Sequence, residues 1–229
     1  MKLEPLGDAA VVATLGSASD APAMASALGL AERLVAARAR GIVDVVAAYA
    51  TVTAFYDPLQ FLDPQEDAYD CVCRLIETCG ARSAREPSAA GGGAVDIPVC
   101  YGGDLGPDLD FVARRCGLDA AGAAALHAGA PYVVHAVGFT PGFPYLGGLP
   151  AALHTPRRDT PRARVPAGSV GIGGSQTGVY PVASPGGWQI IGRTPVALFR
   201  ADGNPPALLK PGDRVRFRAI SASEFDSWK

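Results

Sequence analysis

Two segments among the first eighty residues have the periodicity of amphipathic helices. In the alanine-rich stretch at residues 20–40, apolar positions recur at helical spacing and Gly41 provides a stop. At residues 64–79, a second set of apolar positions falls on one helical face, and this face includes Cys71 and Cys79. We therefore predict two helices, with both cysteines in the core.

Strand patterns surround these two helices. Residues 2–15 alternate about a turn signal at Gly7-Asp8, as two short strands do, and residues 43–56 are rich in Val, Thr, Tyr and Phe. The second pattern is typical of two strands or of one long bent strand. Two helices over a small antiparallel sheet form an α+β domain, which we place at residues 1–82.

A linker and a second, β-rich domain follow. The run GARSAREPSAAGGG is small, polar and rich in glycine, and it predicts a linker that we place at residues 83–94. In the second domain, residues 95–229, Pro98 indicates an edge or a bulge in the first strand, and Asp119 is an N-cap candidate. The predicted elements are a strand at 95–101, short helices at 109–116 and 120–127, a strand at 132–139 and a final strand in KPGDRVRFRAI, where Arg214, Arg216 and Arg218 alternate with apolar residues. A mostly antiparallel barrel with small helices fits this half.

Composition narrows the class of protein. Of 229 residues 48% are hydrophobic, and 20 basic side chains against 22 acidic ones give a net charge of -2. This balance is typical of a globular protein and gives no electrostatic reason to expect nucleic-acid binding. The sequence shows no signal-peptide pattern and no apolar run long enough to span a membrane, so we expect a cytoplasmic protein without membrane contact. The five cysteines form no CxxC pair and the three histidines lack ligand spacing, which predicts buried free thiols and no metal site.

Residues 138–194 are dense in glycine and proline, yet apolar and aromatic residues recur between them. They include GFTPGFPYLGGLP, PRRDTPRARVPAGSVGIGGSQTGVYP and SPGGWQIIGRT. Together with IPVCYGGDLGPDL near Ile97 and PGDRVRF near Pro211, these runs resemble the family of the 5-oxoprolinase B subunit. That family is also called allophanate hydrolase subunit 1, and it includes Kip-type inhibitors of a sporulation kinase. The resemblance covers nearly the whole chain.

The resemblance implies both a fold and an activity. The fold is a small, ferredoxin-like α+β domain followed by a cyclophilin-like β-barrel. The activity is that of a non-autonomous subunit of an ATP-dependent 5-oxoprolinase, a hydrolase that opens a cyclic amide. The implied partners are a homologous barrel subunit, the C subunit of 5-oxoprolinase, and an A subunit of the lactam-utilisation type, with ATP used by the complex. The same family implies an alternative, a regulatory protein that inhibits a histidine kinase. Proline isomerisation by analogy with cyclophilin is disfavoured, because a fold does not carry a function.

A cluster of arginines is the first candidate for chemistry. Arg157, Arg158, Arg162 and Arg164 crowd four guanidinium groups into one turn-rich segment, opposed only by Asp159. Guanidinium groups match carboxylates and phosphates, so this segment predicts an anion site. A solvated basic loop, or a set of salt bridges between subunits, is an alternative that remains open.

The segment at residues 166–178 is the second candidate. Its backbone N–H groups, glycines and polar side chains could cradle an oxyanion, although simple barrel turns would explain the glycines equally well. The candidate side chains are those of Ser169, Ser175, Gln176 and Thr177. The pattern GxGxxG fails at Gln176, and the nucleophile pattern GxSxG fails at Ala167.

Aromatic residues and one histidine complete the set of candidates. We predict that Tyr180 and Trp188 line a pocket or an interface, and that Phe139 and Phe143 lie in the core. GWQIIGRT resembles a nucleotide-binding loop, but Arg193 replaces its lysine and the run reads as a strand, so we keep Arg193 only as an anion-binding candidate. His135 is a candidate acid or base at the barrel mouth, with a structural role as the alternative. The catalytic residues are otherwise unknown, and the sequence does not locate ATP.

Overall fold

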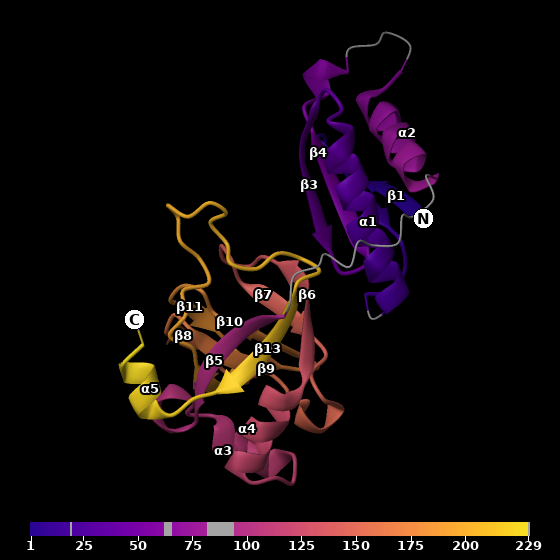
Figure 1. Cartoon of the computed structure of the whole chain (residues 1–229). Coiled ribbons are helices and arrows are strands. Elements are labelled where there is room, and N and C mark those ends of the chain that lie inside the picture. The colour runs from indigo at the N-terminus through magenta and orange to yellow at the C-terminus, as the bar shows by residue number, and fades with distance from the viewer. Residues whose placement is uncertain (19, 62–65, 82–93, 229) are drawn as a thin grey trace. The chain divides into compact units, whose positions relative to one another are not determined.

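A computed structural model of the chain describes residues 1–18, 20–61, 66–81 and 94–228. Residue contacts divide the chain into two compact units, Met1–Gly92 and Gly93–Lys229, and each unit is described by itself (Figure 1). Apart from Ala94, the linker predicted at residues 83–94 lies outside the described residues.

The N-terminal unit is a four-stranded antiparallel sheet with two helices. Its elements are β1 (Lys2–Pro5), β2 (Ala10–Thr14), α1 (Ala21–Ala37), β3 (Ile42–Ala48), β4 (Thr51–Tyr56), a 3-10 turn (Pro58–Gln60) and α2 (Ala68–Ala81). The strand order is β1-β2-β4-β3, and both predicted helices are present. Residues 43–56 form two strands, which is one of the two alternatives left open by the sequence. The chain order is strand, strand, helix, twice over, which differs from the βαββαβ order of a ferredoxin-like domain. The α+β class is confirmed, and the ferredoxin-like topology is not.

The helices of this unit bury one face each. In α2 the buried positions are Val72, Ile76 and Cys79, which are spaced by four and three residues and therefore lie on one side of the helix. Cys71 is one position away from this face and is only half-buried, so its predicted place in the core is wrong. All five cysteines are free thiols, as predicted, although only Cys79 and Cys100 are buried.

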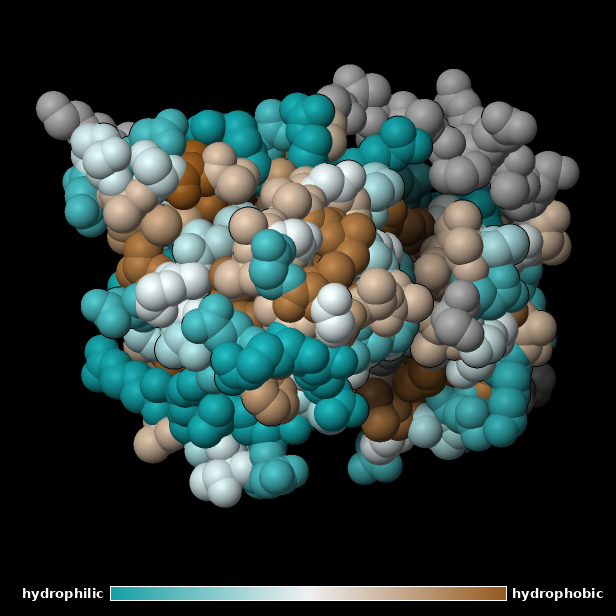
Figure 2. Space-filling model, turned by 90° about the horizontal axis from the view of Figure 1, so that it is seen from below, coloured by the Kyte–Doolittle hydropathy of each residue, from teal (hydrophilic) through white to brown (hydrophobic). Residues whose placement is uncertain are grey.

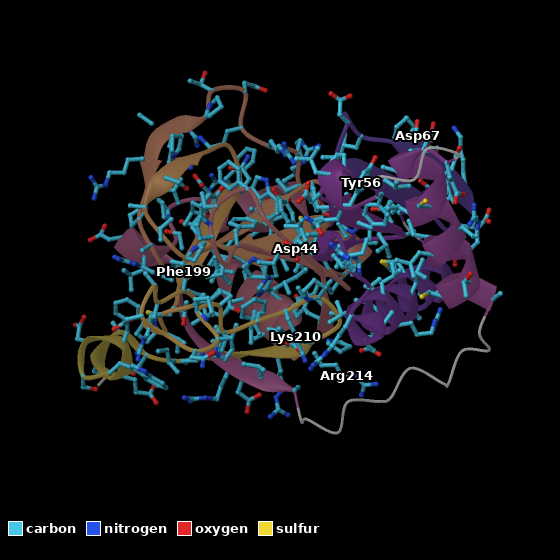
Figure 3. The ribbon with its side chains drawn as sticks, turned by 90° about the horizontal axis from the view of Figure 1, so that it is seen from above. Asp44, Tyr56, Asp67, Phe199, Lys210 and Arg214 are labelled. Atoms are coloured by element: carbon cyan, nitrogen blue, oxygen red, sulfur yellow. The ribbon has the colours of Figure 1, made fainter. Side chains whose placement is uncertain are left out.

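The helix α2 begins close to a buried tyrosine at the end of β4. Asp67 precedes α2, and its Oδ1 accepts the N–H of Tyr69 at 3.0 Å, which satisfies a backbone donor of the first turn. Figure 3 labels Tyr56 and Asp67 together in this unit. Tyr56 is 5% exposed, and burial, followed by the Asp67 carboxylate, raises the pKa of its hydroxyl.

The C-terminal unit is a closed barrel of seven strands in the order β10-β7-β6-β13-β5-β12-β9. The barrel strands are β5 (Val95–Tyr101), β6 (Pro131–Val137), β7 (Pro144–Gly147), β9 (Ser169–Gly173), β10 (Gln176–Val179), β12 (Gln189–Arg193) and β13 (Arg214–Ala219). Neighbouring strands are antiparallel except β13 and β5, so the predicted, mostly antiparallel barrel is confirmed. The strands β8 (Arg162–Val165) and β11 (Ser184–Gly186) form a separate two-stranded pair, here called the β8–β11 ribbon.

Short helices accompany the barrel. They are α3 (Leu109–Arg115), α4 (Ala120–Gly129), α5 (Ala222–Asp226) and two 3-10 turns (Gly103–Leu105 and Ala151–Leu153). The sequence patterns predicted α3 and α4 but not α5. Asp119 is the N-cap of α4, because its side chain accepts the N–H of Gly122 at 2.7 Å. In Figure 2, which looks from below at the end of the barrel that carries α3 and α4, hydrophobic residues lie among hydrophilic ones.

Side chains fill the barrel interior. In β13, Val215 and Phe217 are 1% and 2% exposed, while Arg214 and Arg216 point outward, which is the alternation predicted from the sequence. Lys210 and Arg214, both labelled in Figure 3, lie on either side of the tight turn that leads into this strand. Pro98 pairs with β13 on one side, and β12 meets β5 only further along the strand. None of the described helices is long and apolar enough to cross a membrane.

Candidate functional site

A buried carboxylate organises the arginine cluster. Asp108, just before α3, is 6% exposed. Its Oδ1 accepts from Arg158 Nη1 at 3.3 Å and from Arg162 Nη2 at 2.8 Å, while its Oδ2 accepts the N–H of Ile190 at 2.6 Å. The N–H of Asp108 in turn donates to the Ile190 carbonyl at 2.8 Å. Two guanidinium groups are therefore held side by side on one oxygen atom of a carboxylate whose other oxygen is bonded to β12.

The segment that carries the arginines is also fixed at its backbone. The N–H of Arg158 donates to the Gly187 carbonyl at 2.7 Å, and Gln189 Nε2 donates to the Pro156 carbonyl at 3.0 Å. Arg162 begins β8 and pairs with Gly186 of β11. Because both ends of the segment are tied to neighbouring strands, Arg158 and Arg162 do not belong to a solvated basic loop.

An aromatic cluster lies next to the arginines on the outer side of the barrel. Phe143 meets Tyr180 and Trp188 edge to face, with ring centroids 5.1 Å and 5.5 Å apart. The three rings are 2–5% exposed. Arg157 lies over the Trp188 ring, with its guanidinium carbon 5.9 Å from the ring centroid, as in a cation–π contact.

Glycines of the barrel strands make room for Trp188. A Cβ atom at Gly173 would lie 2.5 Å from Trp188 Nε1, and one at Gly178 would lie 3.1 Å from the indole Cζ3. Val170 and Ile172 of the same strand point into the barrel, so the alternating glycines of β9 face outward, toward the indole. Gly171, Gly173 and Gly178, which belong to the segment predicted as an oxyanion loop, instead pack against the Trp188 side chain.

This part of the sequence prediction needs a correction. Residues 169–179 form the β9–β10 hairpin, in which Gln176 pairs with Gly173 and Val179 with Val170 across a two-residue turn. Backbone N–H groups in a barrel hairpin donate to the neighbouring strand and are not free to hold an anion. The alternative left open by the sequence, barrel turns, describes the segment.

The arginines and aromatics enclose a cavity of about 350 Å³. The residues that line the cavity are Phe139, Phe143, Tyr145, Tyr180, Trp188, Arg157, Arg158, Pro161, Pro185, Gly186 and Gly187. The lining comes from β7, β11 and the residues that flank β8, β10 and β12, and it includes none of the residues that fill the barrel interior. Burial raises the pKa of the Tyr180 hydroxyl, which keeps it protonated at neutral pH.

Phe139 stands at this cavity in an unusual conformation. Its side chain is 63% exposed, so the prediction that it lies in the core is wrong, whereas Phe143 is buried as predicted. The φ angle of Phe139 is +69°, a left-handed value that is rare for a bulky residue and turns the ring away from the core. The ring meets Phe143 edge to face at 5.6 Å.

Comparison with known proteins identifies the family. Residues 1–209 match the family model described as "Carboxyltransferase domain, subdomain C and D". The chain is 40% identical to the B subunit of 5-oxoprolinase from Bacillus subtilis (strain 168), over 100% of this chain and 96% of that protein. It is 54% identical to the B subunit of 5-oxoprolinase from Escherichia coli O157:H7, over 68% of this chain and 70% of that protein. The chain belongs to the 5-oxoprolinase B-subunit family.

A solved structure of similar fold supports the architecture. The crystal structure of TTHA0988 superposes with a TM-score of 0.79 at 39% sequence identity. The match covers 93% of this chain and 40% of that chain, so this member of the B-subunit family corresponds to less than half of the solved protein. The resemblance inferred from the sequence motifs is confirmed.

Several of the predicted site residues do not line the cavity. Ser169 is 2% exposed within β9, and Ser175 is exposed in the β9–β10 turn next to Gln176. Arg193 Nε donates to the Ala167 carbonyl at 2.7 Å. In β6, Tyr132 and Val134 point into the barrel. His135 comes directly after Val134 and so lies on the outer face of the strand, not at the barrel mouth. Burial lowers the pKa of His135.

Thr177 belongs to a buried network inside the barrel. Its hydroxyl donates to the Gly171 carbonyl at 2.9 Å and so must accept from His127 Nε2, which is also 2.9 Å away. His127 Nδ1 then accepts from the Tyr101 hydroxyl at 2.8 Å. His127 is 0% exposed, and burial lowers its pKa to about 3, so the ring is neutral and structural. Among the described residues, no three His, Cys, Asp or Glu side chains gather as a metal site.

Proposed function

We propose that the chain is the B subunit of an ATP-dependent 5-oxoprolinase. The complex converts 5-oxoproline, ATP and water to glutamate, ADP and phosphate. The observation that carries this proposal is the 40% identity to a protein named as the B subunit of 5-oxoprolinase over the whole of this chain. The partners are the homologous barrel subunit, of the C type, together with an A subunit of the lactam-utilisation type, and the complex works in the cytoplasm, where ATP is available. The histidine-kinase alternative stays an untested prediction.

The chain contributes a substrate-binding surface to this complex. Arg157 and Arg158 at the cavity, with Arg162 beside them on Asp108, suit the carboxylate of an amino-acid-derived substrate. Tyr180 and Trp188 supply apolar surface next to these charges. Ser169, Ser175, Gln176, Thr177 and Arg193 take no part in this surface, because they do not line the cavity.

Reconstitution tests this function. The chain is copurified with its two partner subunits, and glutamate and phosphate are measured with and without ATP and with and without 5-oxoproline. We expect release of both products only when all three subunits and both substrates are present, and little turnover by the single chain. A complete, folded complex that releases no glutamate from 5-oxoproline and ATP would refute the proposal.

A further inference from the structure

Unpaired polar atoms gather around the cavity. Among the described residues, four buried side-chain nitrogen or oxygen atoms have no hydrogen-bond partner. They are Arg158 Nε, Arg162 Nη1, Thr140 Oγ1 and Ser184 Oγ. Arg158 lines the cavity, and the other three residues each adjoin a lining residue in the chain. Buried polar groups in folded proteins are nearly always paired, so these exceptions mark the segments around the cavity as a candidate ligand site.

Two of the unpaired atoms belong to guanidinium groups, and this determines the charge of the ligand. Three arginines, Arg157, Arg158 and Arg162, gather at the cavity, and Asp108 is the one acid that pairs with them among the described ion pairs. The cluster therefore holds two positive charges in excess. Unpaired guanidinium N–H donors beside excess positive charge favour an anion, and their fork geometry matches a carboxylate.

The volume and the lining residues of the cavity indicate the size and polarity of its ligand. A volume of about 350 Å³ lies at the lower end of the range of roughly 300–1,000 Å³ for ligand pockets. Aromatic rings and two prolines form most of the remaining wall. A compact body with little polarity suits these surfaces.

Phe139 has a side chain that can cover a ligand in the cavity. A left-handed φ in a bulky residue costs free energy, of the order of 1–3 kcal/mol, and such strain is found where function requires it. The strained backbone of Phe139 holds a largely exposed ring at the cavity, a position in which the ring buries little surface in the absence of a ligand. The ring already contacts Phe143 on one side, and a bound ligand would bury part of its exposed surface.

We propose that this cavity binds a small carboxylate with a compact cyclic body, with Arg157 and Arg158 donating to the carboxylate and Phe139 covering the ring. The inference rests on the proposed function, which provides a molecule of this class, 5-oxoproline, as the probe. It adds to that function the compact shape of the ligand that this site accepts and the residue that covers it.

Ligand binding to the full-length chain tests the inference. The chain has two tryptophans, Trp188 in the cavity and Trp228, which is 42% exposed. In a Trp228→Phe background, fluorescence therefore reports on Trp188 alone. We expect a saturable change with L-5-oxoproline, and binding about tenfold weaker or worse for 2-pyrrolidinone, which has the same ring without the carboxylate.

Two variants separate a binding role from a structural one. Arg158→Lys keeps a positive charge for Asp108 but removes the Nε donor, and it should weaken 5-oxoproline binding about tenfold. Phe139→Gly relieves the left-handed φ, so it should weaken binding about threefold to tenfold while the unfolding midpoint stays within about 4 °C of the parent. Phe111→Ala removes another exposed phenylalanine, 44% exposed on α3, and should leave binding unchanged.

Several results would overturn the inference. They are the absence of saturable 5-oxoproline binding, equal affinity for 2-pyrrolidinone, tighter binding of ATP or inorganic phosphate, or unchanged binding in both cavity variants. Turnover by the assembled complex is measured separately. An active complex whose KM is unaffected by Arg158→Lys rejects the cavity and keeps the proposed function. If the complex is inactive while the isolated chain still binds 5-oxoproline in this manner, the function is rejected and the cavity is kept.

Discussion

Replacing Asp108 with asparagine should destabilise the barrel, because one carboxylate organises the arginine cluster. Asp108 accepts three hydrogen bonds, from Arg158, from Arg162 and from the backbone of Ile190. Asparagine keeps the shape of the side chain but has only one acceptor oxygen. Its amide must therefore face either the Ile190 N–H or the two guanidinium groups, donor against donor.

The size of the effect follows from these contacts. A hydrogen bond to a charged group contributes about 1.5–3 kcal/mol to stability, and a neutral one roughly 0.5–1.5 kcal/mol. The side chains of Arg158 and Arg162 are 37% and 25% exposed, so water replaces part of what they lose. We therefore expect Asp108→Asn to lower the free energy of unfolding by about 2–3 kcal/mol, and Asp108→Ala by about 3–5 kcal/mol.

Urea unfolding measures this change. The Trp228→Phe background again makes Trp188 the only fluorescent tryptophan, so the transition reports on the barrel. Asp104→Asn is the matched control, since Asp104 is exposed in a 3-10 turn, and it should change stability by less than about 0.5 kcal/mol. If Asp108→Asn costs less than about 1 kcal/mol, or no more than the control, Asp108 does not organise the cluster.

Two further predictions concern the barrel interior and the floor of the cavity. Burial holds the pKa of His127 at about 3, below its ordinary 6.5, so the unfolded chain takes up the proton first. His127 should therefore contribute a loss of barrel stability of up to about 1.4 kcal/mol per pH unit below about pH 6, and His127→Gln should reduce the slope by this amount in urea unfolding at several pH values. His135, whose pKa burial also lowers, should keep part of the slope. Gly173→Ala places a methyl group against Trp188 and should cost about 1–3 kcal/mol and weaken 5-oxoproline binding. Gly129→Ala, with no atom within 4 Å of the added group, should stay within about 0.5 kcal/mol, and equal costs for the two glycines would contradict this account.

Local patterns were sufficient to predict most of the fold. The helix α1, the hairpins and the alternation of β13 follow from apolar spacing, which the chain carries in short windows. The closed barrel order is different, because β13 pairs with β5 in parallel although more than a hundred residues separate them. No local window specifies such a pairing. The strand patterns indicated a mostly antiparallel barrel, but they did not specify its strand order.

The candidate site was predicted only in part, for a physical reason. Sequence reasoning selected Arg157, Arg158, Tyr180 and Trp188 because arginine clusters and aromatics in Gly/Pro frameworks are visible locally. It missed Asp108, which lies about fifty positions before its arginine partners and reads in the sequence as an ordinary acid near a helix start. Its burial was the missing information, because only burial makes a single carboxylate the partner of two guanidinium groups.

The two polar networks of the barrel differ in how well their donors and acceptors are matched. In the interior, Tyr101, His127 and Thr177 form a neutral chain in which donors and acceptors are matched. Outside, Asp108, Arg158 and Arg162 form a charged cluster that leaves two guanidinium nitrogens buried and unpaired. A matched neutral network stabilises a fold by itself, whereas buried nitrogen atoms that lack an acceptor cost stability. The interior of this barrel is thus its scaffold, and the outer side, under the β8–β11 ribbon, is where substitutions should change binding more than folding.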